Sequence, residues 1–574
     1  MKRSITLLIA LALAIVLTVP ALGEEKNDFA GFQPFEEPVK TKTVIGYSEA
    51  DIPDAGVLPS TCEWNSMVKD YLNIEFDWMW EVPTSQYRTK LDLALSSGQY
   101  PDILKCDFET MNYLKEADML ADLTDVWEQY ASAPLRAVLD PYLYTTTDEN
   151  GKLYAIPYAN NVAGEMHVTF WRKGWLDNLG LDVPTNFEEY TAAIKAMRDG
   201  DPDGNGIKDT YGICFWSDLF ASRFGMNSVF NAFGAYPGTW IERDGAIVRG
   251  DIQPEVKEAL DYLRELYAGG YIPPEFATYS RDQAISQIVS GQIGQYGGKW
   301  FVPDYAVVID NMKDDVNADR FCIAMPGMTD DAPAVMSVPQ KTASDYNVVL
   351  KTASEEAKIG MIKLLNLFYD INFYADVEHG GSGNTYWFSL DPESEEYQAH
   401  RSRHFAWWLP VNIWNPSANF DIVKLLDNYQ ATGEWDDNIY ALTQENKTYW
   451  EKAFASLEAG RDACTTEAEL DVYLDARKNA ICRFDSDYAG ECALTIVDKL
   501  MKSGNTELAI YYGPETETGV AVSSTLSDLF TQYICRYIMG LEAEDSFDTF
   551  VANWNAMGGE AWTAEVNAAY NASR

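Results

Sequence analysis

Residues 171–190 read WRKGWLDNLGLDVPTNFEEY and residues 201–212 read DPDGNGIKDTYG, and no other part of the chain says as much about its fold. Between the two runs the pattern predicts one helix. Thr185 and Glu188 have the spacing of a capping box, which marks a helix start. Apolar residues then recur at spacings of three and four, which indicates a helix with one face in a core: Phe187, Tyr190, Ile194 and Met197.

The acid-rich run after this helix has the register of a calcium-binding loop. In an EF-hand loop, oxygens come from positions 1, 3, 5, 7 and 9, and a glycine at position 6 makes the sharp turn. The matching residues are Asp201, Asp203, Asn205, Gly206, Ile207 and Asp209. Ile207, at position 7, would contribute its backbone carbonyl. Gly212 stands where an EF-hand has its bidentate Glu, so water or a distant carboxylate would have to complete the shell. We predict a structural Ca²⁺ ion here; the alternative is a surface turn held by side-chain-to-backbone hydrogen bonds.

Four further segments occur in a recognisable order along the chain. They are SGQYPDI at 97–103, DENGKLYAIP at 148–157, GQIG at 291–294 with Trp300, and the C-terminal run 547–570. Together with the two runs above, they resemble the extracellular solute-binding proteins of family 1, in the Gram-positive lipoprotein branch that serves oligosaccharide ABC importers. The resemblance spans most of residues 44–574.

The resemblance implies a two-lobe, periplasmic-binding-protein-like α/β fold with an interlobe cleft and a helix-rich C-terminal part. Strand-like and helical stretches that alternate along the chain independently favour α/β lobes. The predicted division is a signal peptide at 1–23, a flexible leader at 24–42, a first lobe at 43–163 and 303–410, and a second lobe at 164–302 and 411–574. Residues from about 425 to 505 match the family poorly and are predicted to be a helical insertion.

The N-terminus has the features of a secretory signal peptide. Lys2 and Arg3 precede an apolar stretch over residues 5–19, and small residues lead to a cleavage site near Gly23. This stretch is shorter than the roughly 20 residues that span a bilayer. Related lipoproteins carry a Cys at the cleavage point, but Glu24 stands there, so no lipobox cysteine is present. We expect a secreted or cell-surface protein that is a monomer.

Composition excludes some classes of function. The chain has 43 basic and 88 acidic residues, a formal charge of −45, so we expect no nucleic-acid partner. It contains no H-E-x-x-H or phosphate-binding G-x-x-x-x-G-K-[ST] motif, and we predict that it is not an enzyme. A glycoside hydrolase needs only two carboxylates, so a secreted glycoside hydrolase remains an alternative, as does a surface adhesin that holds polysaccharide.

The ligand-binding candidates are aromatic and polar residues near the predicted crossings between lobes. Sugar rings present apolar faces to aromatic side chains, while their hydroxyls pair with polar groups. Trp300 leads the candidates, because Gly297 and Gly298 before it would let the backbone approach a ligand. The others are Tyr158, Asn160, Asn161, Trp407, Trp408, Trp414, Asn412, Arg403, Trp216 and Trp64. The net negative charge favours a neutral glycan, unless Arg172, Lys299 or Arg403 lines the cleft.

Overall fold

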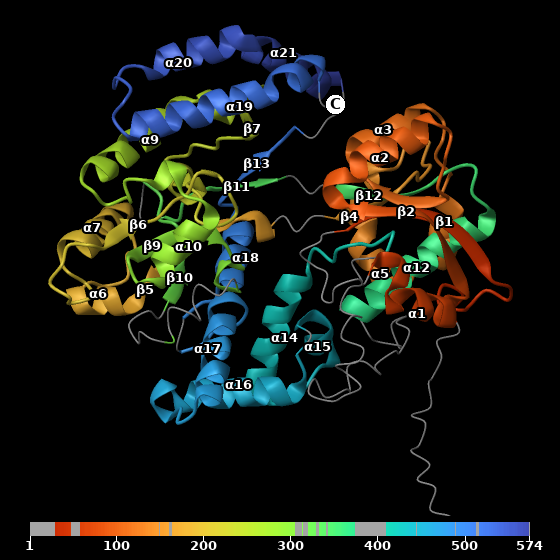
Figure 1. Ribbon diagram of the computed structural model, residues 1–574, viewed down its shortest axis with the longest axis horizontal. Helices are drawn as coiled ribbons and strands as arrows, with labels where there is room; N and C mark the ends of the chain where they lie inside the picture. The colour runs from red at the N-terminus through yellow and green to blue at the C-terminus, as the bar shows by residue number, and fades with distance from the viewer. Residues whose placement is uncertain are drawn as a thin grey trace, which may run out of the picture.

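The structure is a computed structural model. It describes residues 29–47, 58–148, 150–159, 163–304, 313, 320–328, 332–339, 343–373, 409–443, 445–487, 490–511 and 516–572. Figure 1 shows two α/β lobes side by side, each built on its own sheet. The predicted fold class is therefore confirmed.

The first lobe contains a five-stranded sheet in the order β2-β1-β3-β12-β4. Its strands are β1 (Val39–Tyr47), β2 (Ile74–Pro83), β3 (Ile103–Cys106), β4 (Ile156–Ala159) and β12 (Ala343–Val349). Its helices are α1 (Glu63–Leu72), α2 (Thr84–Ser96), α3 (Phe108–Glu116), α4 (Thr124–Tyr130), α5 (Ala133–Leu139) and α12 (Glu355–Phe373). β1 runs parallel to β2 and β3, whereas β12 is antiparallel to β3 and β4. Helices on both faces bury this sheet, as is usual for parallel strands.

The second lobe contains a four-stranded sheet in the order β10-β5-β9-β6. Its strands are β5 (His167–Arg172), β6 (Tyr211–Ile213), β9 (Ile293–Lys299) and β10 (Arg320–Ile323), and a separate hairpin is formed by β7 (Trp240–Arg243) and β8 (Ala246–Arg249). Its helices are α6 (Lys173–Leu179), α7 (Phe187–Asp199), α8 (Asn227–Ala232), α9 (Pro254–Ala268) and α10 (Arg281–Val289). Every residue of β5 is buried, since the strand lies inside the sheet with helices on its faces.

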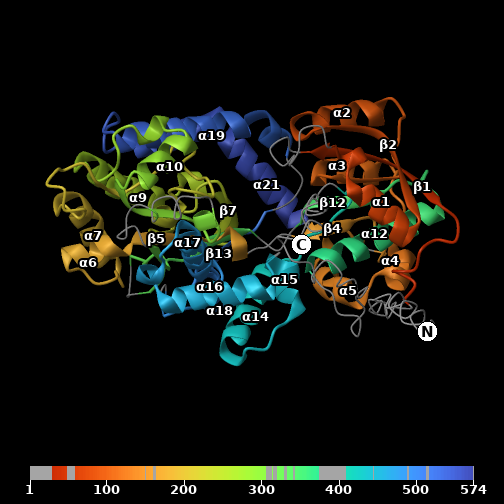
Figure 2. The same ribbon diagram turned by 60° about the horizontal axis from the view of Figure 1, so that its bottom comes forward.

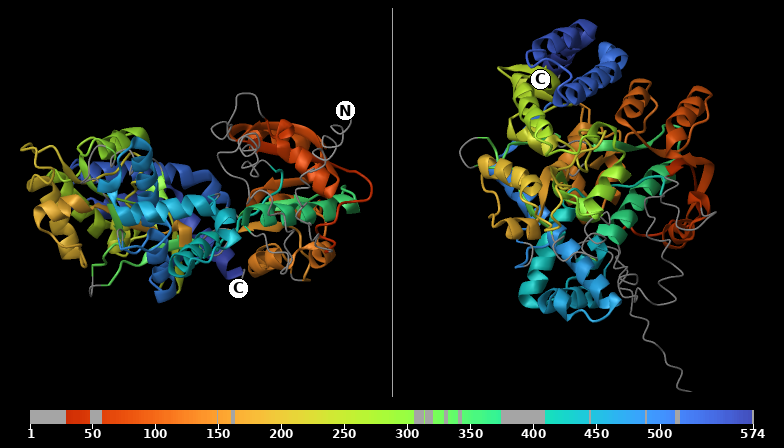
Figure 3. Two further views of the ribbon diagram at one scale, coloured as in Figure 1. Left: turned by 90° about the horizontal axis from the view of Figure 1, so that it is seen from below. Right: turned by 60° about the vertical axis from the view of Figure 1, so that its left-hand side comes forward.

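The C-terminal part is mostly helical. It comprises α14 (Ala418–Thr432), α15 (Asp437–Thr443), α16 (Lys447–Ala459), α17 (Glu467–Cys482), α18 (Ala493–Ser503), α19 (Glu517–Ile538), α20 (Phe547–Trp554) and α21 (Glu560–Ala572). Figure 2 brings α14 to α18 forward, and Figure 3 shows them from below and from the side. Trp450 and Leu494 from this group lie in the same core as the second-lobe sheet, and α18 contacts β5 and β10. The predicted helical insertion is thus part of the second-lobe core.

The helix predicted between the two quoted runs is α7, and its apolar face is buried as expected. The cap lies one residue later than predicted. Asn186 is the N-cap, and its side chain accepts a hydrogen bond from the backbone N–H of Glu189. Thr185 instead donates from its backbone N–H and its hydroxyl to the Glu189 carboxylate.

Three predicted boundaries were wrong. Residues 24–42 were assigned to a flexible leader, but β1 begins at Val39 and the Lys363 ammonium donates to the carbonyl of Gln33. Residues 411–574 were assigned to the second lobe, but Val411 and Ile413 lie in the first-lobe core. Residues 303–410 were assigned to the first lobe, but β10 pairs with β5, and β11 (Met336–Pro339) pairs with β13 (Thr506–Ala509). Strand pairing between distant segments decides lobe membership, and local sequence does not show it.

No helix in the part of the chain that the structure describes is long and apolar enough to cross a membrane.

Candidate functional site

The ends of the two sheets approach each other where the chain first passes between the lobes. Ala159 ends β4 in the first lobe, and Ala163 begins the short helix that leads into β5 of the second lobe. Because an extended chain rises at most about 3.6 Å per residue, these two residues lie within about 14 Å. Side chains at these ends of the sheets are therefore candidates to contact one ligand.

On the first-lobe side, a buried asparagine fixes the site. Asn347 on β12 is 0% exposed and donates from Nδ2 to the carbonyl oxygens of Ile156 (3.1 Å) and Asn412 (2.8 Å). Its Oδ1 accepts from the backbone N–H of Asn412 at 3.1 Å. These bonds hold the segment around Asn412 against the sheet, so that Asn412 Oδ1 accepts from Lys105 Nζ at 3.1 Å. Lys105 Nζ also lies 5.0 Å from the centre of the Tyr158 ring.

Burial governs the electrostatics of this side. Burial lowers the pKa of Lys105, and the nearby Asp345 carboxylate offsets part of that effect. Burial, followed by the Asp345 charge, raises the pKa of Tyr158 to about 12. Tyr158 is therefore a neutral phenol at physiological pH, able to donate one hydrogen bond and accept others.

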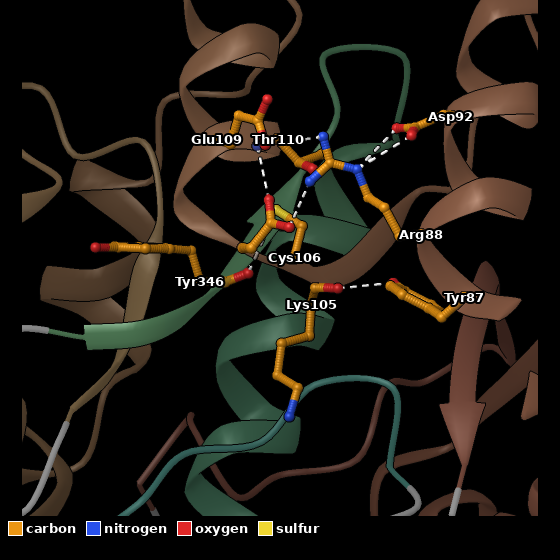
Figure 4. A network of polar contacts seen from close by, with 9 residues as sticks. Tyr87, Arg88, Asp92, Lys105, Cys106, Glu109, Thr110 and Tyr346 are labelled. Atoms are coloured by element: carbon orange, nitrogen blue, oxygen red, sulfur yellow. Dashed lines mark hydrogen bonds and ion pairs between the residues drawn. The ribbon is translucent and has the colours of Figure 1, made fainter. Parts of the chain in front are cut away.

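A polar network above Lys105 holds the end of β3 (Figure 4). Arg88 Nη1 donates to Asp107 Oδ2 at 2.5 Å, and Asp107 Oδ1 caps α3 by accepting from the Thr110 backbone N–H at 2.8 Å. The Tyr87 hydroxyl donates to the Lys105 carbonyl at 2.7 Å. Figure 4 shows the Lys105 side chain pointing away from the Arg88 cluster, so this network fixes its backbone and leaves its ammonium to the site.

On the second-lobe side, the site lies at the carboxyl end of β9. Lys299 pairs with His167 across the sheet, and Lys299 Nζ contacts Glu165 Oε2 at 2.5 Å. Burial, and then the Lys299 charge, lower the pKa of His167 to about 3, so this imidazole is neutral. The partly buried Trp300 ring follows directly and meets the Phe301 ring edge-on, with centroids 5.7 Å apart.

Two arginines cover these rings. Arg483 follows α17, and its guanidinium carbon lies 5.4 Å from the Trp300 ring centre, while Arg483 Nη1 donates to Asn479 Oδ1 at 2.9 Å. The Arg223 guanidinium lies 5.6 Å from the Phe301 ring centre. The C-terminal helices thus deliver a cation to the predicted tryptophan. This placement could not be read from the sequence.

Gly297 and Gly298 do not serve the purpose that the sequence suggested. A Cβ on Gly298 would come within 2.6 Å of Val302 Cγ2 and 3.1 Å of the Ser222 carbonyl oxygen, and a Cβ on Gly297 would meet Ser228 Oγ at 3.1 Å. The space beside these glycines is filled by the protein itself. Their small size allows the segment around Ser222–Ser228 to pack against β9, so they give a ligand no extra room.

The structure separates the remaining candidates. Trp216 is partly buried and donates from Nε1 to the Arg223 carbonyl at 2.8 Å, which places it beside the site. Trp414 is partly buried against the first-lobe core. Trp64 is 2% exposed inside that core and is not placed to meet a ligand. The other candidates lie outside the described residues: Asn160, Asn161, Arg403, Trp407 and Trp408.

Sequence reasoning missed four residues of this site, namely Lys105, Arg223, Phe301 and Arg483. Lys105 lies just after the run at 97–103, and Phe301 follows Trp300. Their positions near the ends of predicted strands could have marked them as candidates. The sequence had instead suggested Arg172 as a cleft cation, but it is 1% exposed, with its guanidinium 4.6 Å from the Trp175 ring.

The predicted calcium loop is folded around an amide group. Asn205 Nδ2 donates to Asp203 Oδ2 at 2.8 Å and lies 3.3 Å from Asp209 Oδ1, while Asp201 Oδ2 accepts from the Gly206 backbone N–H at 3.0 Å. Gly206 has φ = +77°, so the sharp turn is present. Burial raises the pKa of Asp203, and the Asp201 and Asp209 carboxylates raise it further. Among the described residues, no group of three or more His, Cys, Asp or Glu side chains is arranged to hold a metal ion as it stands.

Three cavities lie elsewhere. One of about 700 Å³ is lined by β10 and α18, one of about 560 Å³ by residues of α5, α12, α14 and α15, and one of about 370 Å³ by residues of β8 and α21. Trp300, Tyr158 and Lys105 line none of these three.

Several known proteins are similar to this chain in sequence. It is 22% identical over 512 residues to the polygalacturonan/rhamnogalacturonan-binding protein YtcQ of Bacillus subtilis, a match that covers 88% of each chain. It is 25% identical over 276 residues to FusA of Streptococcus pneumoniae, a fructooligosaccharide ABC transporter substrate-binding protein, covering 45% of this chain and 50% of FusA.

Solved structures share the fold. An HMO-binding, ABC-transporter-associated solute-binding protein from Bifidobacterium longum infantis superposes with a TM-score of 0.57 at 15% identity, covering 93% of this chain and 99% of the other. The alginate-binding protein AlgQ2 gives a TM-score of 0.54 at 13% identity, covering 94% and 99%. The family model of bacterial extracellular solute-binding proteins matches residues 63–366, which is more than half of the chain. The chain belongs to the bacterial extracellular solute-binding protein family.

Proposed function

We propose that this chain is an extracytoplasmic receptor that captures an oligosaccharide between its lobes and delivers it to the permease of an ABC importer. Two groups of aromatic and polar residues carry the proposal. Tyr158, Lys105 and Asn412 contact one another on the first lobe, and Trp300 and Arg483 do so on the second lobe. Aromatic faces suit the C–H faces of sugar rings, and the polar groups suit their hydroxyls. The names of YtcQ and FusA, which are binding proteins for oligo- or polysaccharides, support the same class of ligand.

Domain closure is the proposed mechanism. A ligand that contacts Tyr158 and Trp300 at once interacts with both lobes only when they are close, so it favours the closed state. The permease then distinguishes loaded from empty receptor by that difference in shape. A signal peptide cleaved near Gly23, with no lipid attached at Glu24, is the proposed route to the outside of the cell.

Two alternatives predict different behaviour. A glycoside hydrolase would release new reducing ends from its ligand, whereas a receptor would not. A surface adhesin would hold long polysaccharide without a preference for short oligomers. The relatives above are named as binding proteins or transporter components, which supports the receptor.

Calorimetry with a panel of short neutral and acidic oligosaccharides tests the proposal. We expect at least one oligomer to bind with saturable one-to-one stoichiometry, to reduce the radius of gyration measured by X-ray scattering, and to show no new reducing ends in the same sample. Release of reducing ends would establish the hydrolase instead. Binding of polymer but of no oligomer would favour the adhesin.

We further propose that the Asp201–Asp209 loop holds a calcium ion with a structural role. The donor types and their order fit, and the Asn205 amide nitrogen lies between two carboxylates where a cation would lie. Binding requires this amide to turn its oxygen inward and the carboxylates to converge. The charge of the ion would offset the burial of Asp203 and its repulsion by Asp201 and Asp209, which together raise the pKa of Asp203.

Calcium is therefore expected to raise the melting temperature above that in chelator. An ion bound only by the folded state stabilises by RT ln(1 + [L]/Kd), which is about 2.7 kcal/mol at one hundred times Kd. Differential scanning calorimetry in calcium and in EDTA measures the difference. Asp203→Asn should abolish it, and Asp244→Asn, in an exposed Asp-Gly turn of the same lobe, should leave it intact. Identical melting curves for the unmodified chain would show that the loop is only a turn.

A further inference from the structure

Three aromatic rings at the proposed site each have a cation over one face. Lys105 lies 5.0 Å from the Tyr158 centroid, Arg483 lies 5.4 Å from Trp300 and Arg223 lies 5.6 Å from Phe301. These pairs come from both lobes, in a chain that has twice as many acidic as basic residues. Each of these three rings is therefore faced by a cation, although the chain as a whole is strongly acidic.

Lys105 is the cation whose surroundings are least complete. An ammonium has three N–H donors. Among the described residues, its single hydrogen-bond acceptor is Asn412 Oδ1, a neutral group. The side chain is half-buried, and burial lowers its pKa by more than the Asp345 charge restores. A half-buried cation with unfilled donors is costly unless a further acceptor arrives.

None of the neighbouring groups that the structure describes supplies that acceptor. Burial raises the pKa of the Tyr158 hydroxyl, which therefore stays neutral, and the Lys105 ammonium faces the ring of Tyr158. Asp345 acts on Lys105 through its charge, without a hydrogen bond from the ammonium. On the other lobe, Lys299 is already paired with Glu165 at 2.5 Å. Arg483 donates a hydrogen bond to the neutral Asn479, and its positive charge acts on the nearby Glu445 carboxylate.

A carboxylate fits the Lys105 ammonium better than a hydroxyl does. Charge-assisted hydrogen bonds are roughly twice as strong as neutral ones, and a carboxylate also compensates the buried charge. The formal net charge of −45 does not prevent the binding of a carboxylate at Lys105. At physiological salt, charges further away than about 8 Å are largely screened, so the cations in contact with the ligand decide its local interaction.

We propose that the ligand is an oligosaccharide that carries carboxylate groups, and that Lys105 is the residue that selects it by binding one of those groups. This inference rests on the proposed function of the site. The sugar rings of the ligand would stack on Tyr158 and Trp300. Arg483 and Arg223 would face the ligand from the second lobe.

Matched acidic and neutral ligands test the inference by calorimetry. The probes are short oligogalacturonates, oligomannuronates and oligoglucuronates, each with its carboxyl-reduced form, which keeps the ring, linkage and length but has no charge. We expect at least one acidic oligomer to bind about tenfold or more tightly than its reduced form, a difference of about 1.4 kcal/mol. Lys105→Met should remove most of this preference.

Lys115→Met is the matched control, because Lys115 is also a first-lobe lysine over a tyrosine ring, 5.3 Å from the centre of Tyr154. It should keep the preference. If Lys105→Met does not fold, the unmodified chain still decides the proposal. Rising salt concentration must weaken the binding of the acidic oligomer and leave the binding of the neutral one unchanged.

The outcomes separate the two proposals. Equal or tighter binding of the neutral oligomers overturns the choice of an acidic ligand and leaves the receptor function intact. Binding of none of these oligomers, or of any oligosaccharide in the wider panel, overturns both. If Lys105→Met still binds the acidic oligomer more tightly than its reduced form, by the same factor, the proposed role of Lys105 is overturned.

Discussion

Trp300→Ala is expected to weaken binding of the oligosaccharide by about 2 to 4 kcal/mol, or roughly 30- to 1000-fold, the range for an aromatic hot spot. Trp300 lies at the end of β9 that faces the crossing between lobes and is only partly buried. Its removal deletes the stacking surface for a sugar ring and the support for Arg483. Calorimetry on both proteins measures the loss.

Melting curves distinguish this outcome from a folding defect. Because Trp300 is only partly buried, the free energy of unfolding should change much less than the roughly 3 to 5 kcal/mol of a core tryptophan. Trp300→Phe keeps a smaller aromatic surface and should retain part of the affinity. Unchanged affinity with a large fall in melting temperature would mean that Trp300 is a core residue, and would remove it from the site.

Trp64→Ala is expected to have the opposite profile, a loss of about 3 to 5 kcal/mol in the free energy of unfolding of the first lobe with ligand affinity retained. Trp64 is 2% exposed and packs with the first-lobe core, so truncation leaves a cavity. Its Nε1 has no hydrogen-bond partner among the residues that the structure describes, so Trp64→Phe should cost less. Urea unfolding, followed by a probe in the first lobe, measures both variants.

The ligand affinity of the Trp64 variants is measured below the onset of unfolding. Trp64→Ala is the natural partner of Trp300→Ala, because both remove a tryptophan and only burial distinguishes them. A large affinity loss with unfolding unaffected would show that Trp64 reaches the ligand, contrary to its position in this structure.

Much of the fold was accessible from the sequence because it is encoded by nearby residues. The apolar spacing of Tyr190, Ile194 and Met197 specified α7, and alternating strands and helices specified the α/β class. The N-cap moved by only one residue, to Asn186, since neighbouring Thr and Asn side chains can both satisfy the first helical N–H groups. The family followed from the order of several motifs along the chain.

The site depended on contacts between residues far apart in sequence. Trp300, Tyr158 and Asn412 could be named because they lie near predicted crossings. Lys105 and Asn412 are 307 residues apart, and they meet because Asn347 on β12 ties the later segment to the sheet beside β3. No local pattern records which strands pair, so the tertiary structure alone placed Lys105 and Arg483 at the site.

Contacts between distant segments also explain why the predicted lobe boundaries and the expected role of Gly297 and Gly298 were wrong. The class of fold, α7 and the turn of the acid-rich loop could be predicted from local residue spacing, and the family from the order of motifs along the chain. The membership of β10 in the second-lobe sheet, and the packing of Val302 and the Ser222 carbonyl against Gly298, became known from the folded chain. Sheet order and side-chain packing depend on which distant segments come together, and that is settled when the whole chain buries its apolar surface.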